Sequence, residues 1–127
     1  MGQLKQIRCK NCGEKWELRL GYGLRHGQID ALVPLFPSSS IQRLPLEELR
    51  QFDEPWAFSF EPASCPICRS MVTVPVLRLT KKGETFTGTC SVCDSAADPL
   101  TEDELARTPC PNCGSTELET NDLGRWD

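Results

Sequence analysis

Eight cysteines arranged as four Cys-x-x-Cys pairs constrain this 127-residue chain more than any other feature. The pairs are Cys9/Cys12, Cys65/Cys68, Cys90/Cys93 and Cys110/Cys113, and no cysteine is left over. Two thiolates separated by two residues can bind one tetrahedral ion, while the turn between them directs backbone N–H groups at the sulfur atoms. Two such turns complete a four-thiolate site. The sequence therefore predicts two metal sites, and the expected cofactors are two Zn²⁺ ions.

The residues around the pairs are typical of zinc knuckles. Proline follows the first cysteine in two of the four turns, where it pre-sets the first φ angle. Gly13 and Gly114 each follow a second cysteine, where a tight turn favours a residue that tolerates positive φ. Arg69 and Asp94 stand at that position in the other two turns and depart from this pattern.

Other uses of the cysteines are less consistent with the sequence. Disulfides need an oxidising compartment, and the N-terminal residues lack a hydrophobic signal region, so we expect a cytoplasmic protein with reduced thiols. A thioredoxin-like redox pair needs a βαβ unit, which the pattern does not predict. Iron in a rubredoxin-like site remains the main alternative, because thiolates also bind iron.

The pairing of the four knuckles into two sites is open. The 16 residues between Cys93 and Cys110 (94–109) fall in the usual window for one site, which favours joining these two knuckles. Cys9/Cys12 would then meet Cys65/Cys68. The alternative joins Cys65/Cys68 to Cys90/Cys93 across a predicted hairpin of 21 residues (69–89) and brings Cys9/Cys12 to Cys110/Cys113 at the ends of the chain.

The rest of the sequence predicts a small β-rich fold stabilised by metal. Three Trp, five Phe and one Tyr are few large core residues, while ten Pro and nine Gly favour short elements and turns. We therefore expect two zinc-ribbon-like four-cysteine sites, short antiparallel hairpins and two short helices. Alternating patterns predict strands over 3–9, 15–20, 56–60, 71–79, 85–89 and 115–120. Pro75 favours an edge position for the strand that contains it.

The two helices have local signals. One begins at Pro45, which suits a first helical turn, and the other at Thr101, which forms a capping box with Glu104. The chain then divides into four segments of one compact unit. These are the first knuckle and strand (1–20), an irregular insertion with a short helix (21–55), a hairpin with the second and third knuckles (56–93), and the capped helix, fourth knuckle and acidic tail (94–127).

Several of these motifs carry a family resemblance. The segments are Arg8-Cys-Lys-Asn-Cys-Gly13, Gly21-Tyr-Gly23, and Thr101-Glu-Asp-Glu-Leu105 before Cys110-Pro-Asn-Cys-Gly114. The arrangement resembles zinc-ribbon and rubredoxin-like knuckle proteins, and more narrowly a group of small bacterial proteins with several such knuckles. The resemblance implies metal sites and a fold, and it implies no activity. Apart from Tyr22 and Gly23, residues 22–62 are not covered by it.

The charge pattern bears on partners. The formal net charge is −4, with +3 in residues 1–30 and −7 in residues 91–127. An acidic chain is poorly suited to nucleic acid, whose binding depends on neutralised phosphates. A local basic face remains a candidate nucleic-acid surface, made of Lys5, Arg8, Lys10, Lys15 and Arg19. No apolar run is long enough to cross a membrane.

Catalysis is not expected. His26 is the only histidine, and it lies in a glycine-flanked turn. A catalytic zinc keeps an open coordination position, whereas four cysteine pairs fill two sites completely. Trp126, in the polar tail, is a candidate element for docking a partner, or it packs back onto the body. The expected function is that of a protein–protein adaptor, accessory subunit or assembly factor, with a nucleic-acid-binding ribbon or a rubredoxin-like iron electron carrier as alternatives.

Overall fold

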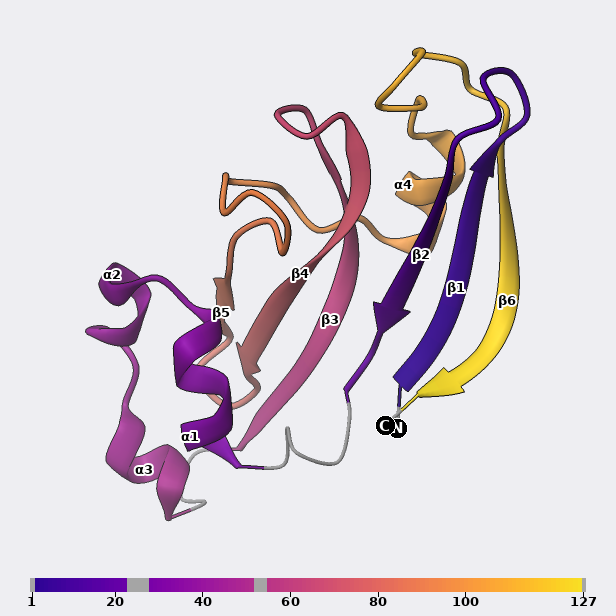
Figure 1. Cartoon of the computed structure of the whole chain (residues 1–127). Coiled ribbons are helices and arrows are strands. Elements are labelled where there is room, and N and C mark those ends of the chain that lie inside the picture. Colours follow the sequence, from indigo (N-terminus) through magenta and orange to yellow (C-terminus); the bar gives the residue numbers. More distant parts are fainter. Residues whose placement is uncertain (1, 23–27, 52–54, 127) are drawn as a thin grey trace.

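The chain forms two antiparallel three-stranded sheets, which lie side by side (Figure 1). The computed structural model describes residues 2–22, 28–51 and 55–126. The first sheet, sheet A, joins the two ends of the chain, and the second, sheet B, is built from the middle.

Sheet A has the strand order β2-β1-β6. Its strands are β1 (Gly2–Cys9), β2 (Lys15–Leu20) and β6 (Leu118–Trp126). β1 and β2 form a hairpin, and β6 pairs with the other edge of β1 from Gly2↔Trp126 to Cys9↔Leu118. The N- and C-termini therefore lie next to each other (Figure 1).

One face of sheet A packs on a small core. Ile7 and Leu18 are buried there with Met71 from sheet B and Leu105 from α4 (Glu102–Arg107). The capping box predicted for α4 is present. The Thr101 hydroxyl accepts from the Glu104 N–H at 3.2 Å, and the Thr101 N–H donates to the Glu104 carboxylate at 3.1 Å. This cap fixes the helix whose Leu105 closes the core of sheet A.

Sheet B has the order β3-β4-β5. β3 (Trp56–Cys65) and β4 (Ser70–Leu79) pair along their full length, and β5 (Glu84–Thr87) pairs with the last four residues of β4. The turn between β4 and β5 contains Lys81, Lys82 and Gly83. Gly83 has a φ of 72° there, which glycine adopts without strain.

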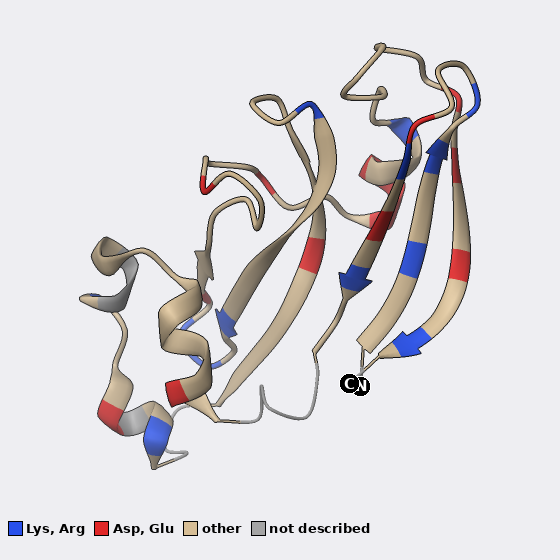
Figure 2. Ribbon diagram, viewed as in Figure 1, with Lys and Arg blue, Asp and Glu red and all other residues tan. Residues whose placement is uncertain are grey.

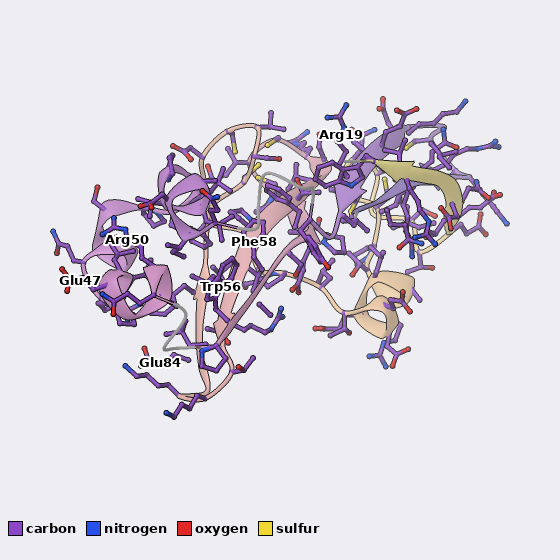
Figure 3. The ribbon with its side chains drawn as sticks, turned by 90° about the horizontal axis from the view of Figure 1, so that it is seen from below. Arg19, Glu47, Arg50, Trp56, Phe58 and Glu84 are labelled. Carbon is purple, nitrogen blue, oxygen red and sulfur yellow. The ribbon has the colours of Figure 1, made fainter. Side chains whose placement is uncertain are left out.

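Short helices cover one face of sheet B. They are α1 (Ile29–Leu32), the 3₁₀ turn η2 (Val33–Leu35), α2 (Ser38–Ile41) and α3 (Leu46–Arg50). Leu32 and Leu49 pack with Phe58, Leu77 and Phe86 of the strands. In the view from below, the charged residues Glu47 and Arg50 lie on the outer side of α3, away from Trp56 and Phe58 (Figure 3).

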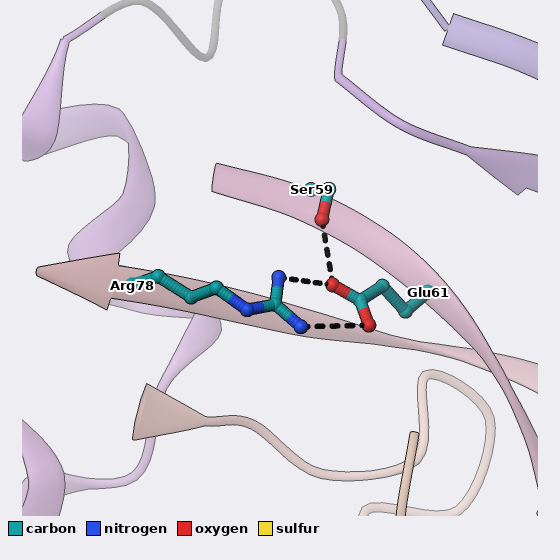
Figure 4. A network of polar contacts seen from close by, with 3 residues as sticks. All are labelled: Ser59, Glu61 and Arg78. Carbon is teal, nitrogen blue, oxygen red and sulfur yellow. Dashed lines mark hydrogen bonds and ion pairs between the residues drawn. The ribbon is translucent and has the colours of Figure 1, made fainter. Parts of the chain in front are cut away.

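The opposite face of sheet B is half covered. The loop 88–99 brings Ala97 and Cys90 against the buried Val72, Val74 and Val76. Farther from the knuckles this face carries the charge network of Figure 4, in which Ser59 donates to Glu61 at 2.9 Å and Arg78 donates to both carboxylate oxygens of Glu61. Burial raises the pKa of Glu61, but the bonds from Arg78 and Ser59 outweigh burial and leave the pKa lowered.

The two sheets are joined by a backbone bridge. Gly21, directly after β2, exchanges two hydrogen bonds with Phe60 of β3, at 2.9 and 2.6 Å. Trp126 at the end of β6 packs near the Phe60 ring, with ring centroids 6.2 Å apart. The bridge and the ring contact hold the edge of sheet B next to sheet A.

Several expectations from the sequence need correction. Residues 121–126 were expected to form a polar tail but belong to β6, because pairing with β1 satisfies their backbone groups. The insertion 21–55 holds α1, η2 and α2 besides the predicted helix α3, because its apolar residues cover sheet B. Pro75 lies in the central strand β4, so its predicted edge position is wrong. β5 ends at Thr87, just before the position where it would need the N–H that proline lacks.

Pro75 fits in the central strand because the residue opposite it, Gly88, has no side chain. We therefore expect Gly88→Ala to destabilise the protein. The Gly88 N–H donates to the Pro75 carbonyl at 2.8 Å. A Cβ at residue 88 would overlap the Pro75 ring and approach the Leu35 carbonyl oxygen to 2.9 Å. Overpacking of this kind costs about 1–3 kcal/mol. Urea unfolding would measure the loss, and an unchanged midpoint would contradict this packing.

Candidate metal centres

The eight cysteines gather in two groups of four. Cluster 1 is Cys9, Cys12, Cys110 and Cys113, and cluster 2 is Cys65, Cys68, Cys90 and Cys93. All eight are free thiols. Within each cluster the four Sγ atoms lie within 4.8 Å of one another, and the closest pairs are 3.3–3.8 Å apart. A tetrahedral ion with metal–sulfur bonds of about 2.3 Å places its ligands about 3.8 Å apart. Both clusters could therefore hold such an ion.

The knuckles share a backbone pattern that aims their sulfur atoms inward. In three of them the N–H of the first cysteine donates to the carbonyl five residues later, at 2.9 Å for Cys9, 2.8 Å for Cys90 and 2.7 Å for Cys110. The remaining knuckle, Cys65/Cys68, forms the turn between β3 and β4, where Cys65 pairs with Ser70. The first cysteine of every knuckle is buried. β1 and β3 thus position Cys9 and Cys65, whereas Cys90 and Cys110 lie in loops and are held by the backbone bonds of their own turns.

The favoured pairing of the knuckles is wrong, and the alternative pairing is the one observed. Cys9/Cys12 meets Cys110/Cys113, and Cys65/Cys68 meets Cys90/Cys93. The pairing of β1 with β6 brings the ends of the chain together, and this is why the first and fourth knuckles share a site. A spacing window counts only the loop between two knuckles, and it does not register strand pairing between distant segments.

A sequence signal for the observed pairing exists. The two knuckles of cluster 1 both read Cys-x-Asn-Cys-Gly, whereas those of cluster 2 have an aliphatic residue in place of Asn and a charged residue in place of Gly. Knuckles of one type share one site. Comparing the knuckles with each other would have been more informative than comparing their spacings.

Hydrogen bonds across cluster 1 connect its two knuckles. The Asn11 amide donates to the Cys113 sulfur at 3.5 Å, and the Asn112 amide donates to the Cys12 sulfur at 3.6 Å. The bond from Asn11, with that from the Ser115 backbone, lowers the pKa of Cys113 to about 6. Burial raises the pKa of Cys110 to about 11. The cluster therefore holds thiol protons at neutral pH that a bound ion would displace.

Cluster 2 has a different set of donors. Bonds from Ser95 lower the pKa of Cys93 to about 6. Contacts with the sulfur atoms of Cys93 and Cys65 raise the pKa of Cys68. The Val92 N–H donates to the Cys90 sulfur at 3.4 Å. Metal binding here would also release protons, and the Cys68 proton is one of them.

All four turns use a left-handed residue after the second cysteine, although only cluster 1 uses glycine. Gly13 and Gly114 have φ of 80° and 79°, while Arg69 and Asp94 have φ of 52° and 65°. The departure seen in the sequence thus leaves the turn geometry unchanged. Arg69 and Asp94 adopt the left-handed conformation, which costs a non-glycine residue about 1–2 kcal/mol.

This strain predicts opposite effects for two matched substitutions. Arg69→Gly is expected to stabilise the protein by about 0.5–1 kcal/mol, because strain relief outweighs the greater freedom of glycine in the unfolded chain. Gly13→Ala is expected to destabilise it by about 1 kcal/mol through φ alone, since no atom lies within 4 Å of the added Cβ. Thermal unfolding of the metal-loaded variants would measure both. Equal signs for the two substitutions would contradict this explanation.

The candidate nucleic-acid residues do not form one basic face. Arg8, Lys15 and Arg19 lie on the outer face of sheet A with Glu17 and Glu119 among them, so the face carries both signs of charge (Figure 2). Lys10 lies in the turn that follows β1. Lys5 points to the other face, where its side chain is 17% exposed and its ammonium is 3.6 Å from the Glu102 carboxylate.

Trp126 packs against the rest of the protein, which is the second of the two roles predicted for it from the sequence. Its indole N–H donates to the Leu20 carbonyl at 2.9 Å, and its ring lies beside Phe60. Trp126 therefore connects the end of β6 to Leu20 of β2 and to Phe60 of sheet B. His26 lies outside the described residues.

No family model matches the chain, and no curated protein or solved structure is significantly similar to it. In the described part of the chain, no helix is both long enough and apolar enough to cross a membrane.

Proposed function

We propose that this chain is a structural zinc protein of the zinc-ribbon type that acts as a protein–protein adaptor, accessory subunit or assembly factor. The observation that carries the proposal is the closure of two groups of four sulfur atoms, each within 4.8 Å. Four protein ligands leave a tetrahedral ion with no open position for water or substrate, and this favours a structural over a catalytic role. Zinc is the preferred ion because it takes tetrahedral thiolate sites without redox chemistry.

The adaptor role is supported by an apolar surface at cluster 2. Ile67 and Val92, one on each knuckle, are 69% and 73% exposed. The matching positions of cluster 1 are Asn11 and Asn112, which are polar. A metal that holds two aliphatic side chains rigidly in water reduces the ordering that a partner would otherwise have to impose on them.

Affinity purification with a matched variant tests the adaptor role. We expect the wild-type chain to retain one or two proteins at near-stoichiometric amounts after nuclease treatment, and Ile67→Ser/Val92→Ser to lose them while keeping its metal. The control is Leu123→Ser, since Leu123 is 45% exposed on β6, away from cluster 2. Retention of the same partners by the Ile67→Ser/Val92→Ser variant would contradict this surface.

The same experiment separates the alternatives. Associated material that disappears with nuclease would indicate a nucleic-acid-binding ribbon, whose affinity would fall steeply with salt. The acidic residues among Arg8, Lys15 and Arg19 weigh against that outcome. A red protein with iron at the clusters would indicate an electron carrier of the rubredoxin type.

A further inference from the structure

The two exposed sulfurs of cluster 1 are each covered by an asparagine from the opposite knuckle. Cys12 and Cys113 are the exposed ligands of this cluster, whereas Cys9 and Cys110 are buried. Cys113 receives the amide of Asn11, and Cys12 receives the amide of Asn112. Each ligand that water or a competing molecule would reach first therefore already accepts an N–H bond.

Cluster 2 lacks this arrangement. Ile67 and Val92 occupy the matching positions, and their side chains have no N–H or O–H group to donate. Cys93 receives bonds from Ser95. The polar contacts of the Cys68 sulfur are with the sulfur atoms of the other three cysteines, and no N–H or O–H of residues 2–22, 28–51 and 55–126 donates to it.

A hydrogen bond to a thiolate offsets part of its charge and makes it a weaker base and nucleophile. Loss of a metal begins when a ligand is protonated or replaced by a competitor, so an uncovered thiolate leaves first. Partners of the ligands change metal affinity by about 10–100-fold. Opening cluster 2 would also relieve the left-handed strain at Arg69 and Asp94, whereas the glycines of cluster 1 store none.

We propose that the two clusters have different roles, with cluster 1 retaining its ion and cluster 2 exchanging its ion with competing ligands, beginning at Cys68. The inference rests on the proposed metal-binding function and goes beyond it. It gives cluster 2 the property of a metal-exchange site for a soft divalent ion such as Zn²⁺. Cluster 1, which closes the ends of the chain, keeps the fold while that exchange takes place.

Zinc transfer to a colorimetric chelator at neutral pH tests the proposal. For the full chain loaded with two equivalents, we expect one equivalent to leave at least about 10-fold faster than the other. Ile67→Asn/Val92→Asn provides the missing donors at exposed positions and is expected to slow the fast phase. The reverse exchange, Asn11→Ile/Asn112→Val, is expected to speed the slow phase. Circular dichroism would confirm that each variant is folded.

Cadmium-113 NMR gives a readout that assigns the phases. The cadmium-loaded chain is expected to show two resonances, one of which is lost first on chelation. Ile67→Asn/Val92→Asn should shift that resonance and leave the other in place. Release of both ions at one rate, or a fast phase that Ile67→Asn/Val92→Asn leaves unchanged, would overturn this inference alone. A chain that binds no metal would overturn the proposed function as well.

Discussion

Replacing Cys9 by serine is expected to remove one metal ion per chain and to unfold sheet A. Cys9 is fully buried at the end of β1 and is one of the four cysteines of cluster 1. The core beneath sheet A is small: its buried residues are Ile7 and Leu18 of the sheet, Leu105 of α4 and Met71 of sheet B. Binding of a structural zinc contributes on the order of 10 kcal/mol to folding, so we expect a loss of at least about 4 kcal/mol.

Metal analysis and hydrogen exchange would measure this effect. The amides of β1, β2 and β6 should lose their protection in the Cys9→Ser variant, while those of β3 and β4 keep theirs because sheet B has its own core. Thr116→Ala, at an exposed position near Cys113, is the control and should change neither result. A Cys9→Ser chain that keeps two ions and a protected sheet A would contradict the role given to cluster 1.

Truncating Leu77 to alanine is expected to give the second large effect, about 3 kcal/mol of unfolding free energy with both ions retained. Leu77 is fully buried between β4 and the helices, against Phe58 and Phe86. Its neighbour in the strand, Arg78, faces the opposite side of the sheet, where it pairs with Glu61.

Arg78→Ala is therefore the matched control for Leu77→Ala. A partly exposed ion pair contributes about 1 kcal/mol or less, so the two adjacent substitutions should differ several-fold in urea unfolding. Similar losses for both, or loss of metal from the Leu77→Ala variant, would show that the helices and sheet B do not form a core separate from the clusters.

Local patterns predicted much of this fold. The alternation of Trp16, Leu18 and Leu20 with charged residues marks a strand with one buried face, and β2 has this burial. The capping box at Thr101 likewise marks a helix start that depends on four adjacent residues. The candidate metal ligands could be predicted because each Cys-x-x-Cys knuckle also spans only a few adjacent residues.

Features that depend on distant pairing were not predicted. The polarity of residues 121–125 indicates a tail, and it is the pairing with β1 and the anchoring of Trp126 by Leu20 that make them a strand. The pairing of the knuckles follows from that strand. The position of Pro75 depends on where β5 ends and on the lack of a side chain at Gly88. Each depends on a partner far along the sequence.

The metal content and the ligand set of the purified chain test directly whether the two clusters are structural metal sites. We predict two zinc ions per chain, each with four sulfur ligands at about 2.3 Å by X-ray absorption, and loss of folded structure in sheet A when both ions are removed by a chelator. A chain that carries fewer than two ions, that binds them through nitrogen or oxygen, or that stays fully folded without them would contradict the assignment of two structural zinc sites.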